Sequence, residues 1–316
     1  MNVLELMEPP AEWLGDALAQ FELQFRYPLG PTRSFRISHG RDYVTFFQAI
    51  GEAHLFVGER RGTVLGTLAA VTRAVRFPSG ETRRVAYLCD LKVAPHARGG
   101  RTLLHLMNAV RARLDVPCCG LAYAVVMDGT ARTPAAYTGQ LSLPAFEKLD
   151  QLMVLRIPTQ GAGECDGRVQ ATNAGTLQSI RDRLSKGQFV PLGGVPATRS
   201  QVEPAYLAMA DGCACGVLED TRRGKRLLDD AGDEILSVHL SRFAYANVSD
   251  AAEFLGSARG LARAAGFPAL ITAIPLADAA KIVDRLAVAD TLLAPATVYG
   301  CGFREAAGWR MDTSEI

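Results

Sequence analysis

The sequence has little excess charge and no long apolar run, and these two shortages limit what the protein can do. Lys and Arg number 34 against 33 Asp and Glu, so the formal net charge is only +1. Electrostatic binding to the phosphates of nucleic acid needs an excess of Lys and Arg over Asp and Glu, and we therefore expect no nucleic-acid partner. No window approaches the roughly 20 apolar residues that span a bilayer, so we expect no membrane partner either.

Cysteine is also used without any framework pattern. The seven cysteines are an odd number, and their spacing is not that of a disulfide scaffold. Cys213 and Cys215 lack a second Cys or His pair at a zinc spacing, so we expect no metal. Residues 1–8 lack the basic start and long apolar stretch of a secretory signal. Together these features predict a reducing, cytoplasmic location.

The length of 316 residues suits two domains of ordinary size, and the balance of 48 % hydrophobic and 21 % charged residues is globular. The clearest break is the glycine-rich stretch 158–167, which has the composition of a linker. We therefore predict a first domain at residues 1–157, a linker at 158–167 and a second domain at 168–316.

Turn signals organise the first of these domains. Two helical stretches, 13–25 and 41–50, precede predicted strands at 54–60, 63–77 and 82–94, which tight turns at 61–62 and 78–81 separate. An apolar stripe then predicts a helix over 101–114, followed by a buried strand at 118–127. Strand, helix and strand form a βαβ unit with a parallel pair. A short helical piece near 134–137 and a terminal strand pair within 146–157 complete the domain.

The second domain repeats part of this order. Strands at 215–219 and 234–247, a helix at 249–265, a strand at 269–274, a helix at 276–286 and a strand at 292–299 follow one another. The fold class predicted is α/β, of the α+β type. It consists of two tandem domains, each a mixed but mostly antiparallel sheet flanked by helices, with a parallel βαβ unit.

The segment from Tyr87 to Leu104 carries the most chemical information. A strand runs into Gly99 and Gly100, which open a helix. Backbone N–H groups in the first turn of a helix have no partner within the helix, so they form an anion site of phosphate size. Arg98 and Arg101 add positive charge beside it. The alternative is an ordinary helix start with solvated arginines.

This segment also resembles a family motif. Val93-x-Pro95-x-x-Arg98-Gly99, followed by Leu103 and Leu104 on a helix, is similar to the CoA-binding motif V-x-P-x-x-R/Q-G-x-G-x-G/A of the GNAT superfamily of N-acyltransferases. The order of elements agrees over roughly residues 50–140. The chain departs from the motif because Arg101 takes the place of the second glycine and Leu103 that of the last small residue. The second domain has no such segment and resembles a degenerate copy.

The resemblance implies an acyltransferase with acetyl-CoA, or another acyl-CoA, as co-substrate and an amine of a small molecule or peptide as acceptor. The pantetheine arm would pair with the open strand edge as an added strand does, and the diphosphate would lie on helix-start amides. The implied cofactor-binding residues are Leu91, Lys92, Val93, Arg98, Gly99, Gly100, Arg101 and Thr102. A backbone N–H near Leu91 would stabilise the oxyanion, and loops at 29–39 and 129–143 would border the acceptor.

Two side chains are candidates for proton transfer. Asp90 is the acidic residue nearest the implied thioester and is a candidate acceptor of the amine proton; its alternative is a pairing with Lys92 or solvent. Tyr137 lies where the family often has a tyrosine that protonates the departing thiolate; its alternative is a packing role. Two other functions stay open: an acyltransferase for a longer acyl donor, and an acyl-CoA-binding regulator without turnover. The protein would be a monomer or a homodimer.

Overall fold

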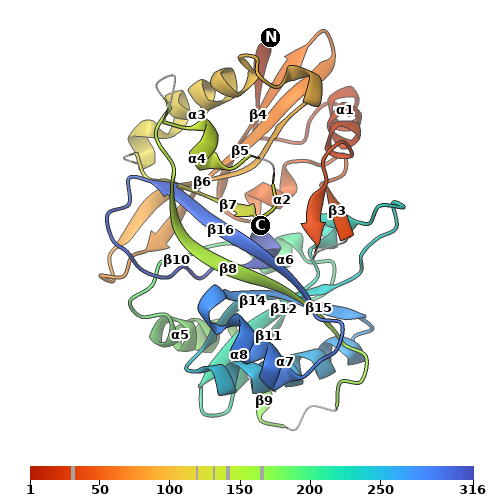
Figure 1. Ribbon diagram of the computed structural model, residues 1–316, viewed down its shortest axis with the longest axis vertical. Coiled ribbons are helices and arrows are strands. Elements are labelled where there is room, and N and C mark those ends of the chain that lie inside the picture. The colour runs from red at the N-terminus through yellow and green to blue at the C-terminus, as the bar shows by residue number, and fades with distance from the viewer. Residues whose placement is uncertain (30–32, 119, 131, 140–142, 164–166) are drawn as a thin grey trace.

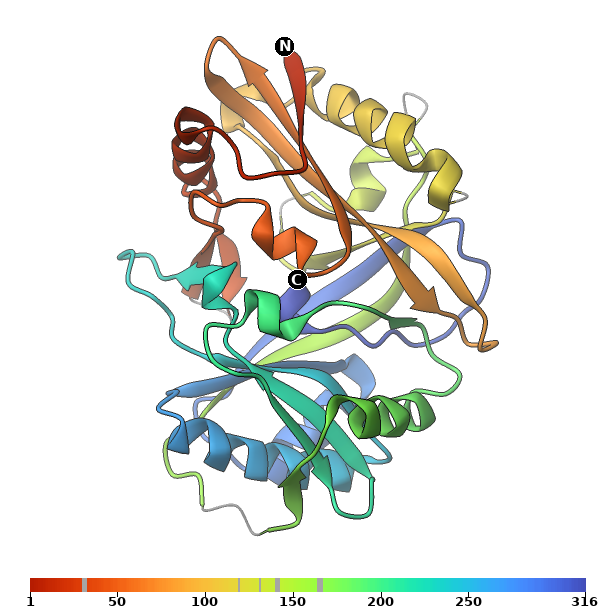
Figure 2. The same cartoon turned by 180° about the vertical axis from the view of Figure 1, so that it is seen from behind.

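The computed structural model describes residues 1–29, 33–118, 120–130, 132–139, 143–163 and 167–316 (Figure 1). Within these residues, thirteen strands join into one sheet that runs through the whole molecule in the order β1-β4-β5-β6-β7-β16-β8-β15-β14-β12-β11-β9, with β10 on β5. A small second sheet has the order β13-β3-β2. Helices cover the ends of the large sheet, and the C-terminus lies in the middle, between the two halves (Figures 1 and 2).

The elements of the first half follow the predicted order with several additions. Its strands and helices are β1 (Asn2–Leu6), α1 (Glu12–Glu22), β2 (Tyr27–Leu29), β3 (Arg33–Ser38), α2 (Thr45–Gln48), β4 (Glu52–Arg60), β5 (Thr63–Arg76), β6 (Thr82–Val93), the 3-10 turn η1 (Pro95–Ala97), α3 (Thr102–Cys118), β7 (Ala122–Met127), α4 (Pro134–Tyr137) and β8 (Glu147–Pro158).

The second half contains the repeated series. Its elements are β9 (Val169–Ala171), α5 (Ala174–Leu184), β10 (Val190–Pro191), α6 (Pro196–Arg199), β11 (Ala205–Met209), β12 (Ala214–Glu219), η2 (Thr221–Arg223), β13 (Arg226–Leu228), β14 (Val238–Tyr245), α7 (Val248–Ala264), β15 (Ala269–Pro275), α8 (Leu276–Leu286), β16 (Leu292–Cys301) and η3 (Thr313–Glu315).

Local turn chemistry explains the β4–β5 hairpin. Arg61 and Gly62 both have positive φ, 54° and 78°, and they connect Arg60 to its partner Thr63. Two consecutive residues with positive φ match the right-handed twist of a hairpin, and glycine reaches this conformation without steric cost. β5 and β6 pair antiparallel and β6 pairs parallel with β7 across α3, as predicted.

The two halves exchange a strand in the middle of the sheet. β8 closes the first half, yet it pairs with β15 of the second half. β16 closes the second half and pairs with β7 of the first half on one side and with β8 on the other. The two strands run side by side across the centre of Figure 1. The sheet is therefore continuous between the halves, and the domain limits drawn at residues 158–167 stay a prediction.

Buried ion pairs also tie the halves to the C-terminal segment. The Glu315 carboxylate is 2.5 Å from Arg73 Nη1 of β5 and 3.1 Å from Arg199 Nη1 of α6. Arg199 also makes a bidentate pair with Glu219 at 2.8 Å. All four side chains are buried. Such charges are stable out of water only when they are paired, so this network fixes residues 313–316 between the two halves.

Three sequence expectations differ from the structure. The helix predicted at 41–50 is limited to α2, Thr45–Gln48. The predicted strand pair within 146–157 is the single strand β8. The loop expected at 29–39 contains β3, which pairs with β2 and with β13 of the second half. No helix in the described ranges combines the length and apolar character that a bilayer crossing requires.

Candidate functional site

The parallel strands β6 and β7 separate shortly after they meet. They pair only at Ala86 with Ala122 and at Tyr87 with Tyr123, although β6 continues to Val93 and β7 to Met127. A cavity occupies the space between the diverging strands. It is lined on the two sides by Leu88 to Leu91 and by Ala124 to Met127. The separation therefore leaves strand edges beside an open space within the sheet.

A β-bulge in β6 lies at this cavity. Thr67 pairs with Lys92 and Ala69 with Cys89, so Leu68 alone stands opposite Asp90 and Leu91. Asp90 has a φ of 53°, a left-handed conformation that Asp tolerates better than most residues. A bulge with its first residue in this conformation bends the strand and increases its twist. The bulge turns β6 away from β7.

The predicted phosphate segment lies beyond the end of β6. Gly99 has a φ of 78°, and a Cβ built on it would meet no atom within 4 Å. The helix-entry hydrogen bond of α3 runs from His105 N to Arg101 O, so the N–H groups of Thr102 to Leu104 precede it and have no partner among the described residues. Arg98 and Arg101 are exposed beside them. The local geometry has the features of an anion site at a helix start.

The Asp90 carboxylate is engaged with three neighbours. It forms an ion pair with Lys92 Nζ and accepts a hydrogen bond from the Tyr43 hydroxyl, while Thr67 Oγ1 lies 3.3 Å from Oδ2. Burial by itself would lower the pKa of Lys92, but Asp90 and Glu22 raise it well above its usual value. The pairing of Asp90 with Lys92, one of the two alternatives left open by the sequence, is the arrangement found.

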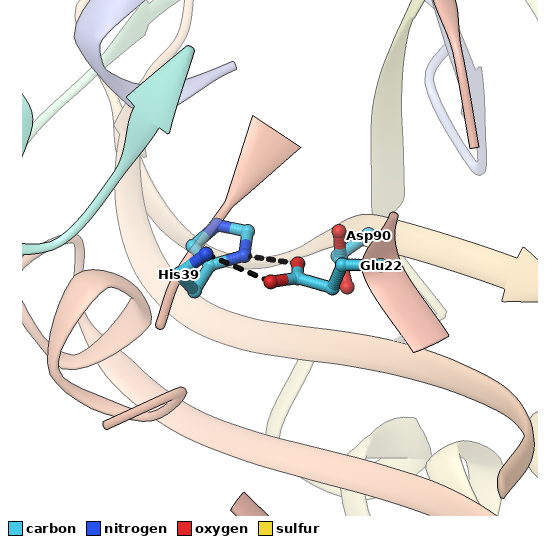
Figure 3. Close-up of side chains that lie close together, drawn as sticks. All are labelled: Glu22, His39 and Asp90. Atoms are coloured by element: carbon cyan, nitrogen blue, oxygen red, sulfur yellow. Dashed lines mark hydrogen bonds and ion pairs between the residues drawn. The ribbon is translucent and has the colours of Figure 1, made fainter. Parts of the chain in front are cut away.

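Glu22 and His39 join this cluster from two other elements (Figure 3). Glu22 is the last residue of α1, and His39 follows β3. Glu22 Oε1 is 2.6 Å from His39 Nδ1 and 2.9 Å from Lys92 Nζ, and Oε2 accepts a bond of 2.8 Å from the His39 backbone N–H. Burial raises the pKa of Glu22, but His39 and Lys92 outweigh it and hold the pKa at about 2. Glu22 is therefore a carboxylate at neutral pH.

The ligand atoms of Glu22, His39 and Asp90 lie within 4.8 Å of one another, a spacing that suits a cation. Lys92 already supplies one, because its ammonium group bonds to both carboxylates. His39 Nδ1 is also committed to Glu22. A divalent metal would have to displace an ammonium that both acids stabilise, so the chemistry of this set favours the internal lysine.

Tyr137 lies on α4 and lines the same cavity as Asp90 and Leu91. Burial, with a smaller effect from Tyr299, raises the pKa of Tyr137 to about 12. Its hydroxyl therefore keeps its proton at neutral pH. The cavity thus brings together three of the predicted site residues. The other predicted residues do not line the cavity. Lys92 and Val93 end β6, and residues 98–102 lead into α3.

The opposite wall of the cavity comes from elements that the sequence analysis did not assign to the site. Phe35, Ile37 and His39 belong to β3 and the residue after it, and Leu227 belongs to β13. Lys225 also lines the cavity. Burial and then Arg199 lower the pKa of Lys225 to about 7, and its Nζ donates a hydrogen bond of 3.1 Å to Thr313 O. The small sheet and the C-terminal segment thus close the side of the cavity away from α3.

The second half contains the same opening, but the chain itself fills it. β14 and β15 pair in parallel only at Val238 and His239. Arg242 then has a φ of 51° in a bulge of β14 that lies opposite Gly216 of β12. Asp312 Oδ1 accepts a bond of 2.7 Å from the Arg242 backbone N–H. Thr313 Oγ1 is 3.0 Å from His239 Nδ1. Residues 312 and 313 therefore occupy, in the second half, the place that is a cavity in the first.

Comparisons by sequence find no relative: no family model matches the chain, and no curated protein matches it significantly. Solved structures are similar. N-myristoyltransferase of Saccharomyces cerevisiae with bound myristoyl-CoA has a TM-score of 0.61 at 10 % identity, covering 97 % of this chain and 84 % of that one. A GCN5-related N-acetyltransferase of Anabaena variabilis has a TM-score of 0.55 at 13 % identity, covering 95 % and 72 %. The chain has a GNAT-type N-acyltransferase fold.

A protein of Enterococcus faecalis described as a probable N-acyltransferase shares this GNAT-type fold, with a TM-score of 0.51 at 11 % identity, covering 95 % of this chain and 72 % of that one. These matches cover nearly the whole chain, so both halves belong to the shared architecture. The predicted fold class is confirmed, and the fold that the resemblance implied is the fold found. Sequence identities this low establish the fold alone, and the reaction is a separate inference.

Proposed function

We propose that the protein transfers an acyl group from acyl-CoA to an amine of a small molecule or peptide, by direct attack in a ternary complex. The observation that carries this proposal is the opening between β6 and β7, with a bulge at Asp90 and, at the start of α3, amides that have no partner in the described part of the chain. An extended pantetheine arm pairs with a free strand edge. The same arm then leads from the cavity to an anion site for the diphosphate.

Acetyl-CoA is the smallest donor for such a site, and the cavities favour a longer acyl chain as the second candidate. A further apolar cavity lies under α3 and shares Leu88, Met107 and Phe146 with the first. It continues along the helix to Val110 and Leu114. An acyl chain placed there would be removed from water, which contributes about 0.8 kcal/mol for each buried methylene group.

The bulge supplies an oxyanion donor in this scheme. In the second half, the N–H of Arg242 holds the Asp312 carboxylate. We propose that a backbone N–H at the equivalent bulge, that of Asp90 or Leu91, bonds to the thioester oxygen in the same way. This bond would stabilise the negative charge that develops on the oxygen. Asp90, the sequence's candidate acceptor of the amine proton, already accepts from Lys92 and Tyr43. Tyr137 is the candidate donor to the departing thiolate.

Thiol release tests the function directly. Acetyl-, octanoyl- and myristoyl-CoA are incubated with the protein and a panel of alkylamines, amino acids and peptides, and free thiol is measured with a chromogenic disulfide. Amine-dependent release supports acyl transfer, and the preferred chain length identifies the donor. CoA binding without turnover for every pair would instead support the acyl-CoA-binding regulator.

A further inference from the structure

His39 has a defined proton arrangement, which follows from its partner. Glu22 has a pKa of about 2 and is ionised at neutral pH, so it can only accept hydrogen bonds. The His39 Nδ1 that lies 2.6 Å from Glu22 Oε1 must therefore carry the proton. Nδ1 is thereby committed to Glu22, and Nε2 is the ring nitrogen left for another partner.

That nitrogen is unused. His39 Nε2 is buried and has no hydrogen-bond partner among the described residues. The side chain is only 2 % exposed and lines the cavity that also contains Asp90 and Tyr137. The large majority of buried side-chain polar atoms have a partner, so an exception needs an explanation. A ligand in the cavity that donates a proton to Nε2 is the explanation that fits this position.

The ring is also held rigidly. The rings of Tyr43, Phe46 and Phe47 lie 5.2, 5.0 and 4.9 Å from its centroid. Glu22 anchors the same residue twice, through Nδ1 and through the backbone N–H. A base whose orientation is fixed by packing and by a carboxylate on its far nitrogen is the arrangement that general-base catalysis requires.

We infer that His39 is the general base that takes the proton from the acceptor amine, and that Glu22 is its positioning residue. The inference rests on the proposed function and deepens it. Asp90 is less free to play this part, because its carboxylate already accepts from Lys92 and Tyr43. Lys92 in turn shares Glu22 with His39 and holds that carboxylate in place.

Protons and electron pairs balance in this step. The acceptor binds as an alkylammonium ion and gives one proton to His39 Nε2, so that its nitrogen gains a free lone pair. That nitrogen forms a C–N bond to the thioester carbon, and the C–S bond then breaks. The departing thiolate takes the hydroxyl proton of Tyr137. A second proton from the former amine nitrogen then goes to the Tyr137 oxygen, and the imidazolium of His39 releases its proton to solvent. The negative charge of Glu22 stabilises the imidazolium while it exists.

Imidazole rescue tests the role of His39. With a donor and amine that the wild-type protein turns over, His39→Ala should lower kcat by about 10²-fold or more, while CoA affinity measured by calorimetry stays within about twofold. Free imidazole should restore turnover of His39→Ala in a saturable way and should not accelerate the wild type. Glu22→Gln should lower kcat as well, and the double variant should lose little more than His39→Ala alone, because the two residues act as a unit.

His54 provides a matched control. It is another buried histidine, with Nδ1 2.7 Å from Glu5 Oε1, and it lies outside the cavity lining. His54→Ala should keep turnover and show no imidazole effect.

Wild-type kcat in His39→Ala, or a loss that imidazole does not repair while CoA still binds, would overturn the inference and leave acyl transfer intact. If His39→Ala does not fold, His39→Gln replaces it, and full turnover of that variant would overturn the inference equally. A wild type that acylates no amine would overturn the proposed function and this inference together.

Discussion

Asp90 and Arg242 occupy equivalent bulges in the two halves of the molecule. Each has a left-handed backbone, with φ of 53° and 51°, and each lies three residues beyond the last parallel pair of its strand, at Tyr87 and at His239. One bulge faces a cavity and the other holds the Asp312 carboxylate. The two halves therefore share the same bulge, but they differ in what fills the opening between the parallel strands beside it.

Gly99 provides a test of the anion site at the start of α3. Gly99→Ala should lower the affinity for CoA, because alanine disfavours the positive φ that shapes the turn before the helix amides. It should also cost about 1–2 kcal/mol of stability. Calorimetric titration with CoA and urea denaturation measure the two effects separately.

Gly80 is the matched control for this change. It has a φ of 91° in the β5–β6 turn, and a Cβ there would also meet no atom within 4 Å. Gly80→Ala should lose similar stability and keep its CoA affinity. Equal affinity losses in the two variants would show that the turn at Gly99 has no special part in binding.

Tyr137 should matter for turnover more than for binding. Because the pKa of Tyr137 is raised to about 12, its hydroxyl stays protonated and able to protonate a thiolate. Tyr137→Phe should lower kcat by about 10²-fold, with CoA affinity nearly unchanged. Tyr206→Phe on β11, outside the cavity, is the control and should have wild-type kinetics. An unchanged kcat for Tyr137→Phe would assign the residue a packing role.

Glu315 should contribute strongly to stability. Its carboxylate pairs with Arg73 and Arg199, which are both buried. Glu315→Gln leaves these cations without full compensation and should destabilise the fold by about 3–5 kcal/mol. Arg83→Gln, which breaks an exposed pair with Glu81, should change the urea midpoint very little. Similar midpoints for the two variants would contradict the role given to the buried network.

Acid should weaken the fold in a defined window. The pKa values of Glu22 and Glu315 are lowered to about 2, against the opposing effect of burial, by His39 and Lys92 at Glu22 and by Arg73 and Arg199 at Glu315. Their stabilisation is fully present above the ordinary glutamate pKa of 4.5 and is lost as the pH falls towards 2. Burial raises the pKa of Asp312 and acts in the opposite direction. Urea midpoints should fall from about pH 5 to about pH 3.

Glu22→Gln is the control for this acid effect. The variant lacks one of the two titrating carboxylates, so its urea midpoint should depend less steeply on pH than that of the wild type. A slope equal to that of the wild type would show that Glu22 does not contribute to the acid transition.

Local signals in the sequence predicted the elements that depend on local chemistry. The Arg61-Gly62 turn and the strand–helix–strand series around Gly99 are each encoded within a few residues, and both are present. The exchange of β8 and β16 was not predictable in this way. β16 is largely apolar and β8 carries an apolar run within Leu152–Leu155, but which edge each strand joins depends on pairing between residues far apart in the chain.

The polar cluster was missed for the same reason. Glu22 lies at the end of α1, His39 just after β3 and Lys92 on β6, and the sequence pattern of each predicts only a face or a loop. The one signal present was the acidic residue at the apolar end of α1, where Glu22 is fully buried. A buried charge needs a partner, but nothing in the sequence names which histidine or lysine supplies it.

Calorimetric titration of the wild-type protein with CoA is the decisive experiment for the assignment of the two halves. The first opening is a cavity, with helix-start amides beyond it that bond to no residue the structure describes, whereas Asp312 and Thr313 fill the second. We therefore expect saturable binding of one CoA per chain. No heat of binding, or two molecules bound per chain, would contradict this assignment.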